Sequence, residues 1–309
     1  MTSGPAPVRF GVVTRTEPRD VRRAEELGFD SLWCGGHIAS RNPSPEVMAQ
    51  LGRLSALAER ALIGTSVLTL PLYPPAVIAK QAADIDVATG GRLILGVGVG
   101  GEYPEEFRAC EVPVSERGSR MNESIALLRE FWSGRTVSFT GKHYQVQDVL
   151  MRPTPTASGG PPIIVAGRQP AAMRRAALLG DGWMPYLYSP RRYARSVQAI
   201  TGLAASAGRD LSRFDWCVFV FTNVHADGDE ARDQAADFLG GSYRQDFRAM
   251  LESVAAAGTV PEVRAKIAAF ADAGARHIII TPASRTRSRE IAEIIAREIA
   301  PSITKERTA

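Results

Sequence analysis

The chain of 309 residues contains few cysteines and histidines, with three and four copies respectively. Cys34, Cys110 and Cys217 form no CxxC pair, and no group of His, Asp or Glu residues has the spacing of metal ligands. The sequence therefore predicts neither a disulfide framework nor a metal site. Because free thiols are typical of a reducing compartment, we expect a cytoplasmic protein.

Long apolar runs and long basic runs are also missing. No apolar stretch approaches the roughly 18 residues that a membrane span needs, and residues 1–10 lack the apolar core of a signal peptide. The net charge of +4 comes from 37 basic and 33 acidic residues that are spread along the chain. This pattern indicates no nucleic-acid partner and no membrane association.

The chain does contain a repeated helix-to-strand rhythm. Four times, in residues 26–34, 88–98, 178–186 and 272–281, a helix-like segment reaches a glycine and an apolar run follows. Glycine tolerates the left-handed conformation that closes many helices, so each of these segments predicts a helix that turns into a strand. Thr259 and Glu262 add a capping box at the start of another predicted helix.

Eight apolar segments have the continuous character of parallel strands that are covered on both faces. They are residues 8–14, 30–35, 61–68, 92–99, 161–167, 182–186, 216–224 and 277–283. Eight strand–helix repeats in a chain of this length predict a single (β/α)₈ TIM barrel rather than an open sheet. The surplus residues fall mainly in two insertions, Ser133–Gly160 and Ala226–Ala257. We expect both on βα loops, where they would help to select the substrate.

Residues 96–101, GVGVGG, formally satisfy the G-x-G-x-x-G pattern of dinucleotide-binding folds. That fingerprint requires a helix that opens on the third glycine, whereas here Pro104 and Pro113 interrupt the segment that follows. A glycine-lined strand end, which lets a flat ring approach the backbone, is the favoured interpretation. Ordinary turn chemistry is the alternative.

Polar and aromatic side chains follow several predicted strands. Arg168 stands at the start of a helix, which predicts an anion site unless this arginine is simply solvated. His37 closes the second strand and is a candidate acid/base, or else a half-buried loop residue. Tyr73, Trp183 and Tyr186 could form the wall of a substrate cavity, although core packing is the commoner role of such residues. We interpret the other three histidines as structural.

Three blocks, residues 63–101, 112–134 and 161–185, together resemble the luciferase-like monooxygenase superfamily, which includes bacterial luciferase and enzymes that use the deazaflavin coenzyme F420. The resemblance implies a TIM barrel that holds its cofactor at the C-terminal mouth of the strands, and it implies a homodimer. The segment TSVLT looks like the bulge of strand three that carries a non-prolyl cis peptide bond in deazaflavin members, here between Ser66 and Val67.

The resemblance also implies roles for individual residues. It places His37 beside the cofactor ring as the catalytic group. The residues implied to back the ring are Ser66, Val67 and Thr69, those beside the cofactor tail are Gly98, Val99, Gly100 and Gly101, and those at its phosphate are Ala166, Gly167 and Arg168.

Two positions depart from the deazaflavin pattern. Many members carry an acidic residue immediately before the histidine, where this chain has Gly36. We therefore expect no adjacent carboxylate to hold the imidazolium of His37, so that the neutral imidazole is accessible at pH 7. The glucose-6-phosphate dehydrogenase branch has a glutamate where Gly101 stands here, with Glu102 displaced by one, which argues against a sugar-phosphate substrate.

Three hypotheses follow from these observations. The first is an F420-dependent oxidoreductase that transfers a hydride to or from an organic small molecule. The second is an FMN-dependent two-component monooxygenase that receives reduced flavin from a separate reductase. The third is a non-catalytic barrel that has lost cofactor binding, against which the intact glycine segments count.

Overall fold

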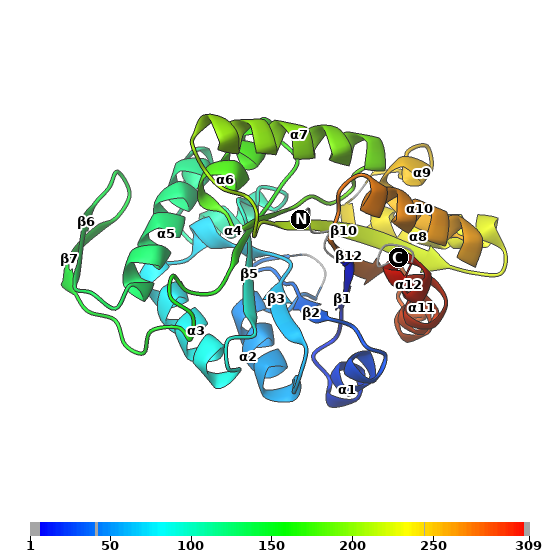
Figure 1. Cartoon of the computed structure of the whole chain (residues 1–309), viewed down its shortest axis with the longest axis horizontal. Coiled ribbons are helices and arrows are strands. Elements are labelled where there is room, and N and C mark those ends of the chain that lie inside the picture. Colours follow the sequence, from blue (N-terminus) through cyan, green and yellow to red (C-terminus); the bar gives the residue numbers. More distant parts are fainter. Residues whose placement is uncertain (1–6, 41–42, 244, 306–309) are drawn as a thin grey trace, which may run out of the picture.

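The computed structural model describes residues 7–40, 43–243 and 245–305 and contains a closed barrel of eight parallel strands (Figure 1). Strand β1 pairs with both β2 and β12, and the pairing of β9 with β10 closes the ring. Each strand coincides with one of the eight predicted segments, β10 beginning one residue earlier than predicted, so the predicted TIM barrel is confirmed. The barrel strands are β1 (Arg9–Val13), β2 (Ser31–Cys34), β3 (Leu62–Thr65), β5 (Leu93–Gly98), β8 (Ile163–Ala166), β9 (Gly182–Met184), β10 (Asp215–Val224) and β12 (His277–Pro282).

Helices surround the strands on all sides in Figure 1. They are α1 (Pro18–Glu26), α2 (Val47–Leu57), α3 (Pro75–Ala88), α5 (Arg117–Trp132), α6 (Pro170–Leu179), α7 (Pro190–Ser206), α10 (Val260–Asp272) and α11 (Ser288–Ile294), which continues through a π-helical turn into α12 (Ala300–Lys305). The predicted capping box of Thr259 and Glu262 is present at the start of α10. No helix in the described ranges is long and apolar enough to span a bilayer.

The helix-ending glycines behave as predicted at three of the four turns. Gly28, the pair Gly90 and Gly91, and Gly274 all have positive φ angles. Gly180 instead has a φ of −90°. At that position glycine is required by space, because a Cβ atom would lie 2.9 Å from Cγ2 of Val165.

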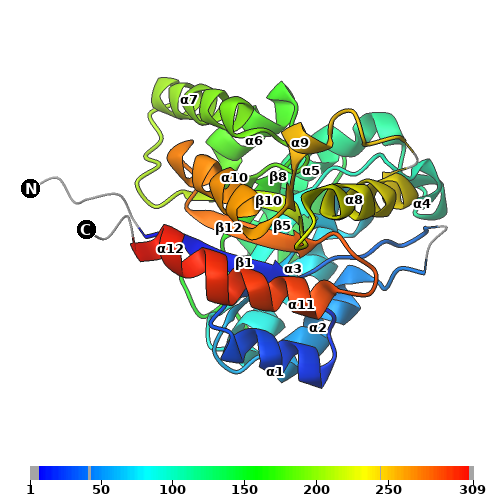
Figure 2. The ribbon, with the colours of Figure 1, turned by 90° about the vertical axis from the view of Figure 1, so that its right-hand side faces the viewer.

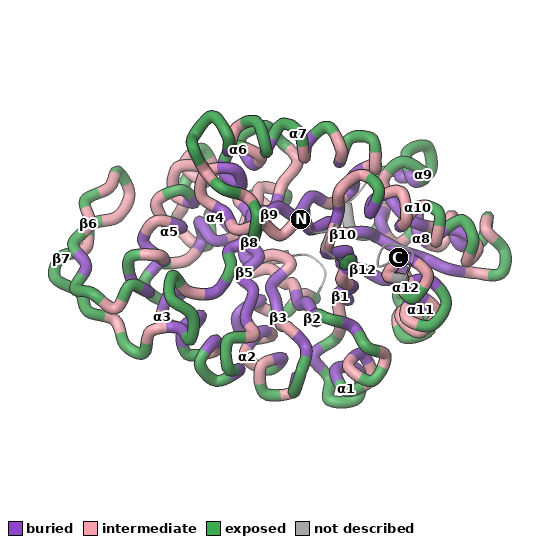
Figure 3. Tube along the Cα trace, viewed as in Figure 1, coloured by how far each residue is buried: buried purple, intermediate pink, exposed green. Residues whose placement is uncertain are grey.

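The core has two parts because side chains alternate along each strand. One face of each strand packs against the helices, and the other fills the barrel. The interior side chains include Trp33, Ile94, Ile164, Met184 and Ile279, all of which are buried. Figure 3 shows the strands as the buried centre of the molecule.

The first insertion lies in a different kind of loop from the one expected. Residues 133–160 connect α5 to β8, so they form a helix-to-strand connection rather than a βα loop. They contain the antiparallel hairpin of β6 (Val137–Thr140) and β7 (Gln145–Val149), which projects beyond α5 in Figure 1. The sequence did not distinguish the two kinds of loop, because hairpin and turn patterns look the same at either end of a helix.

The second insertion lies, as expected, between a strand and its helix. Residues 226–257 follow β10 and contain α8 (Gly228–Tyr243), α9 (Leu251–Val254) and the first residues of β11 (Ala255–Gly258). A further short helix, α4 (Pro104–Ala109), follows β5. Figure 2 shows α4 and α8 at the same end of the barrel, where the strands finish.

Candidate active site at the barrel mouth

A cavity of about 550 Å³ opens at the C-terminal ends of the barrel strands. A volume of several hundred Å³ is typical of small-molecule sites, and TIM-barrel enzymes place their chemistry at this end. Its wall comes from the segments that end or follow β2, β3, β5, β8, β9 and β10. The cavity is therefore assembled from residues that lie far apart in the sequence.

Most of the residues that the resemblance assigned to the cofactor or to catalysis lie around this cavity. They are His37, Ser66, Val67, Thr69, Gly98, Val99, Gly100, Ala166, Gly167 and Arg168. Gly101 follows Gly100 with a φ of 121°, but it is not among the described residues that line the cavity.

Strand three is interrupted where the bulge was expected. β3 ends at Thr65, β4 comprises Leu68–Thr69, and the peptide bond between Ser66 and Val67 is cis, as predicted. The Ser66 N–H donates to the Cys34 carbonyl at 2.8 Å, and the Thr65 hydroxyl donates to the Gly96 carbonyl at 2.7 Å. Hydrogen bonds to both neighbouring strands therefore hold the interruption in place.

The close approach of the interrupted strand explains why two positions of the glycine run must be glycine. A Cβ atom at Gly96 would lie 2.0 Å from the Thr65 carbonyl oxygen, and one at Gly98 would lie 2.8 Å from Cγ2 of Val67. Both distances are too short for a side chain. Gly96 thus serves the close approach of two strands, whereas Gly98 also forms part of the cavity wall.

His37 is bound to a carboxylate that the sequence did not predict. Its Nδ1 lies 3.2 Å from Oε1 of Glu106 on α4, and the same oxygen accepts the N–H of Ile38 at 2.8 Å. The ring of Tyr103 packs edge-on against the imidazole, with 4.6 Å between the ring centroids. The expectation that no carboxylate would hold His37 is therefore wrong. Gly36 supplies no acid, but Glu106 reaches the imidazole from a different loop.

A second polar group lies at the mouth around Tyr186. Its hydroxyl donates to the carboxylate of Glu102, and the guanidinium carbon of Arg168 lies 4.7 Å from the centroid of its ring. Burial, followed by the neighbouring carboxylate of Glu102, raises the pKa of Tyr186. Tyr186 is therefore a hydrogen-bond donor at neutral pH. Arg117, at the start of α5, adds another positive charge to the wall.

Two of the three aromatic residues predicted for the substrate do not line this cavity within the described part of the chain. Trp183 is completely buried on the helix side of β9, where its indole N–H donates to the Gly167 carbonyl at 2.9 Å. Strand alternation turns the next residue, Met184, toward the cavity instead. Tyr73 donates its hydroxyl to Oε1 of Glu46 at 2.6 Å, outside the cavity. Only Tyr186 of the three lies in the wall.

The family model described as luciferase-like monooxygenase matches residues 9–277. The chain belongs to this family. A curated relative, the F420-dependent glucose-6-phosphate dehydrogenase of Microbacterium testaceum, is 28% identical, and the match covers 97% of this chain and 98% of the relative. The protein is accordingly an enzyme of the luciferase-like superfamily.

Two solved structures of luciferase-like enzymes share the fold. One is an F420-dependent secondary alcohol dehydrogenase in complex with an F420–acetone adduct, with a TM-score of 0.85, 21% identity and coverage of 96% of this chain and 99% of that chain. The other is the FMN complex of the oxygenating constituent of 3,6-diketocamphane monooxygenase from Pseudomonas putida, with a TM-score of 0.77, 18% identity and coverage of 96% and 98%. At these identities both similarities show the fold alone.

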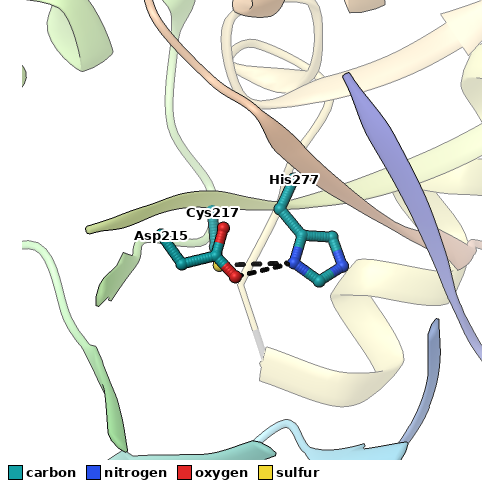
Figure 4. A group of neighbouring side chains, drawn as sticks. All are labelled: Asp215, Cys217 and His277. Carbon is teal, nitrogen blue, oxygen red and sulfur yellow. Dashed lines mark hydrogen bonds and ion pairs between the residues drawn. The ribbon is translucent and has the colours of Figure 1, made fainter. Parts of the chain in front are cut away.

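The opposite end of this luciferase-like barrel contains a buried polar cluster, shown in Figure 4. Asp215, Cys217 and His277 could between them offer three metal-ligand atoms. Nδ1 of His277 lies 3.0 Å from Asp215, its Nε2 lies 2.7 Å from the Ser31 hydroxyl, and Arg9 pairs with Asp215 at 2.7 Å. Because the carboxylate and both ring nitrogens already have partners, the arrangement favours a network that ties β1, β2, β10 and β12 together over a metal site.

Proposed function

We propose that this luciferase-like enzyme is an F420-dependent oxidoreductase that transfers a hydride between the deazaflavin and an organic small molecule. The observation that carries the proposal is that His37, the interrupted strand three, the glycine run and Arg168 all border one cavity. Full-length similarity to an F420-dependent dehydrogenase supports the deazaflavin over other cofactors.

The cavity fits a flat, anionic cofactor. Gly98 and Gly100 line one wall of the cavity and carry no side chain that would narrow it. Arg117 and Arg168 supply positive charge, and the N-terminus of the ten-residue helix α6 begins two residues after Arg168. We assign Ser66, Val67 and Thr69 to the ring of the cofactor. The glycine run is assigned to the cofactor tail, and Ala166, Gly167 and Arg168 are assigned to its phosphate.

His37 handles the proton that accompanies hydride transfer. When bound, the deazaflavin supplies hydride chemistry at its carbon 5, while the protein orients the reactants and moves protons. Nδ1 of His37 is engaged by Glu106, which leaves Nε2 to exchange a proton with the substrate. An imidazole suits this task because it can donate or accept near neutral pH.

Substrates other than glucose 6-phosphate fit this site best. Glu102, the nearest counterpart of the branch's glutamate, is shifted by one position, and its carboxylate is bound to the Tyr186 hydroxyl. The homodimer and the cytoplasmic location remain part of the proposal through the family resemblance. Sedimentation velocity on the full chain tests the first of these.

A second candidate is an FMN-dependent monooxygenase that receives reduced flavin from a reductase. The fold shared with the FMN-bound camphane enzyme keeps this candidate open. The two candidates differ in a direct measurement, because a deazaflavin, which has carbon in place of the flavin N5, reacts poorly with oxygen, whereas reduced FMN reacts readily.

The experiment is a fluorescence titration of the purified full chain with oxidised F420 and with FMN in parallel. We expect F420 to bind at least roughly tenfold more tightly, a difference of about 1.4 kcal/mol. Tighter binding of FMN, together with oxygen consumption in the presence of reduced FMN, would support the second candidate. Binding of neither cofactor overturns both.

A further inference from the structure

The contact between His37 and Glu106 joins two segments that are 69 residues apart in the sequence. The Glu106 side chain is only 3% exposed, whereas that of His37 is 36% exposed. A buried carboxylate must be compensated, and Glu106 is compensated here by the imidazole and by the Ile38 N–H. The carboxylate therefore lies behind the histidine, on the side away from solvent.

The short helix α4 holds Glu106 in this position. Pro104 starts the helix, and Phe107, the residue after Glu106, is completely buried. Tyr103, immediately before the helix, supplies the ring that packs against His37. The segment that carries the glycine run thus continues directly into the two side chains that support the imidazole.

Such a contact has two physical consequences for the histidine. A carboxylate that accepts from Nδ1–H fixes the tautomer and leaves Nε2 as the reactive nitrogen, which is the role of the aspartate in Ser-His-Asp enzymes. A nearby negative charge also favours the protonated imidazole over the neutral one. Loss of the charge alone should therefore change the proton chemistry while the fold is kept.

We propose that Glu106 is the positioning residue of this enzyme, which orients the imidazole of His37 and holds its Nδ1–H tautomer so that Nε2 exchanges the proton with the substrate. The inference rests on the proposed acid/base role of His37. It assigns to α4 a function that neither the glycine run nor the barrel strands supply.

Other titratable groups around Glu106 are kept neutral or are already bound. Burial raises the pKa of the Cys110 thiol, and the Glu106 carboxylate adds to this effect. Burial and the hydrogen bond to Glu46 raise the pKa of Tyr73. Glu46 itself caps α2 by accepting the N–H groups of Met48 and Ala49. Tyr103 presents its ring to His37. These contacts leave Glu106 as the carboxylate bound to the imidazole.

The decisive variant is Glu106→Gln, which keeps the size of the side chain and an oxygen that can accept both hydrogen bonds but removes the charge. Glu105→Gln is the matched control, because it removes a half-buried carboxylate from the same helix one residue away. We expect Glu106→Gln to lower kcat by roughly tenfold and to change the shape of the pH–rate profile. F420 affinity and Tm should stay close to those of the unmodified enzyme and of Glu105→Gln.

A second readout requires neither cofactor nor turnover. ¹⁵N-histidine NMR resolves the tautomer and titration of each of the four imidazoles, and the signal missing from His37→Asn identifies His37. We expect the Nδ1–H tautomer in the unmodified enzyme and a smaller population of that tautomer in Glu106→Gln, whose amide can also donate a hydrogen bond to Nδ1. An unchanged tautomer together with an unchanged pH–rate profile overturns the inference.

The double variant separates this failure from failure of the proposed function. If Glu106 acts through His37, then Glu106→Gln should cause no further loss of turnover in the His37→Asn background. Full turnover by His37→Asn alone would refute the acid/base role of His37. Loss of turnover in His37→Asn with no effect of Glu106→Gln on the tautomer or on the pH–rate profile would refute only the role of Glu106.

Discussion

The buried polar network at the N-terminal ends of the barrel strands predicts how the free energy of unfolding depends on pH. Asp215 is the perturbed group, with a side chain that is 14% exposed. Burial alone would raise the pKa of Asp215, but the hydrogen bond and charge of His277 and the charge of Arg9 lower it to about 2. An unperturbed aspartate has a pKa of about 3.9, so the folded state favours the ionised form.

The size of the effect follows from this difference. Each unit of pKa shift is worth about 1.36 kcal/mol, so ionised Asp215 contributes about 2.5 kcal/mol to the free energy of unfolding at pH 7. Because the pKa is lowered on folding, this contribution is fully present above the unfolded value of about 3.9 and is lost as the pH falls toward 2. Asp215→Asn should therefore be destabilised at pH 7 and only about half as much at pH 3.

The assay is urea unfolding of Asp215→Asn and the unmodified chain at pH 7, 5 and 3, followed by circular dichroism after reversibility has been checked. Asp233→Asn is the control, because its side chain is 70% exposed and its ion-pair distance to Arg248 is 3.9 Å. The control should unfold like the unmodified chain at pH 7. If the loss of stability in Asp215→Asn is the same at all three pH values, the electrostatic argument is refuted.

Three further predictions concern the mouth of the barrel. Arg168→Ala should weaken F420 binding by roughly ten- to a hundredfold in isothermal titration calorimetry, because it removes a charge-assisted hydrogen bond. Arg191→Ala, which removes an exposed arginine, should leave the affinity unchanged, and equal affinities of the two variants would show that Arg168 does not bind the cofactor. His37→Ala should lower turnover by roughly a hundred- to ten-thousandfold with F420 affinity nearly unchanged, and a collapse of affinity instead would make His37 a binding residue. Gly98→Ala should lower the free energy of unfolding by about 1 to 3 kcal/mol, measured by thermal unfolding, because the new Cβ would collide with Val67. Gly202 has open space around it, so Gly202→Ala should not destabilise the chain, and equal melting temperatures of the two variants would contradict the packing argument.

The barrel could be predicted from the sequence because parallel strands covered on both faces produce continuous apolar runs. Each of the eight runs contains a strand of the structure. The placement of the insertions was less accessible, because a hairpin such as β6–β7 carries the same residue pattern before or after a helix. Only the order of α5, hairpin and β8 in the folded chain shows that this insertion follows a helix.

The choice of cavity aromatics failed for a reason that the sequence already contained. Trp183 and Tyr186 are three positions apart, so simple strand alternation cannot turn both toward one cavity. Met184 and Tyr186 are two apart, and both lie in the wall. The odd spacing was thus a signal against one of the two aromatics, although it did not say which.

Glu106 could not be found from local pattern. Residues 102, 105 and 106 are all glutamates in one short segment. Helix α4 is too short to show a hydrophobic periodicity that would indicate which of them turns inward. Its partner is 69 positions away and is brought near only when the loops after β2 and β5 meet at the mouth. The expectation of a histidine without a carboxylate failed because it considered only the neighbour in sequence, Gly36.

The two ends of the barrel use the same pair of groups for different purposes. His277 with Asp215 and His37 with Glu106 are each a histidine bound through Nδ1 to a carboxylate. His277 is completely buried and its Nε2 is bound to Ser31, so this pair can only hold strands together. The His37 side chain is 36% exposed, and of its two ring nitrogens only Nδ1 has a hydrogen-bond partner in the described part of the chain. The difference in exposure follows from position, because His277 begins its strand and His37 follows one, and barrels keep stability at the first end and chemistry at the second.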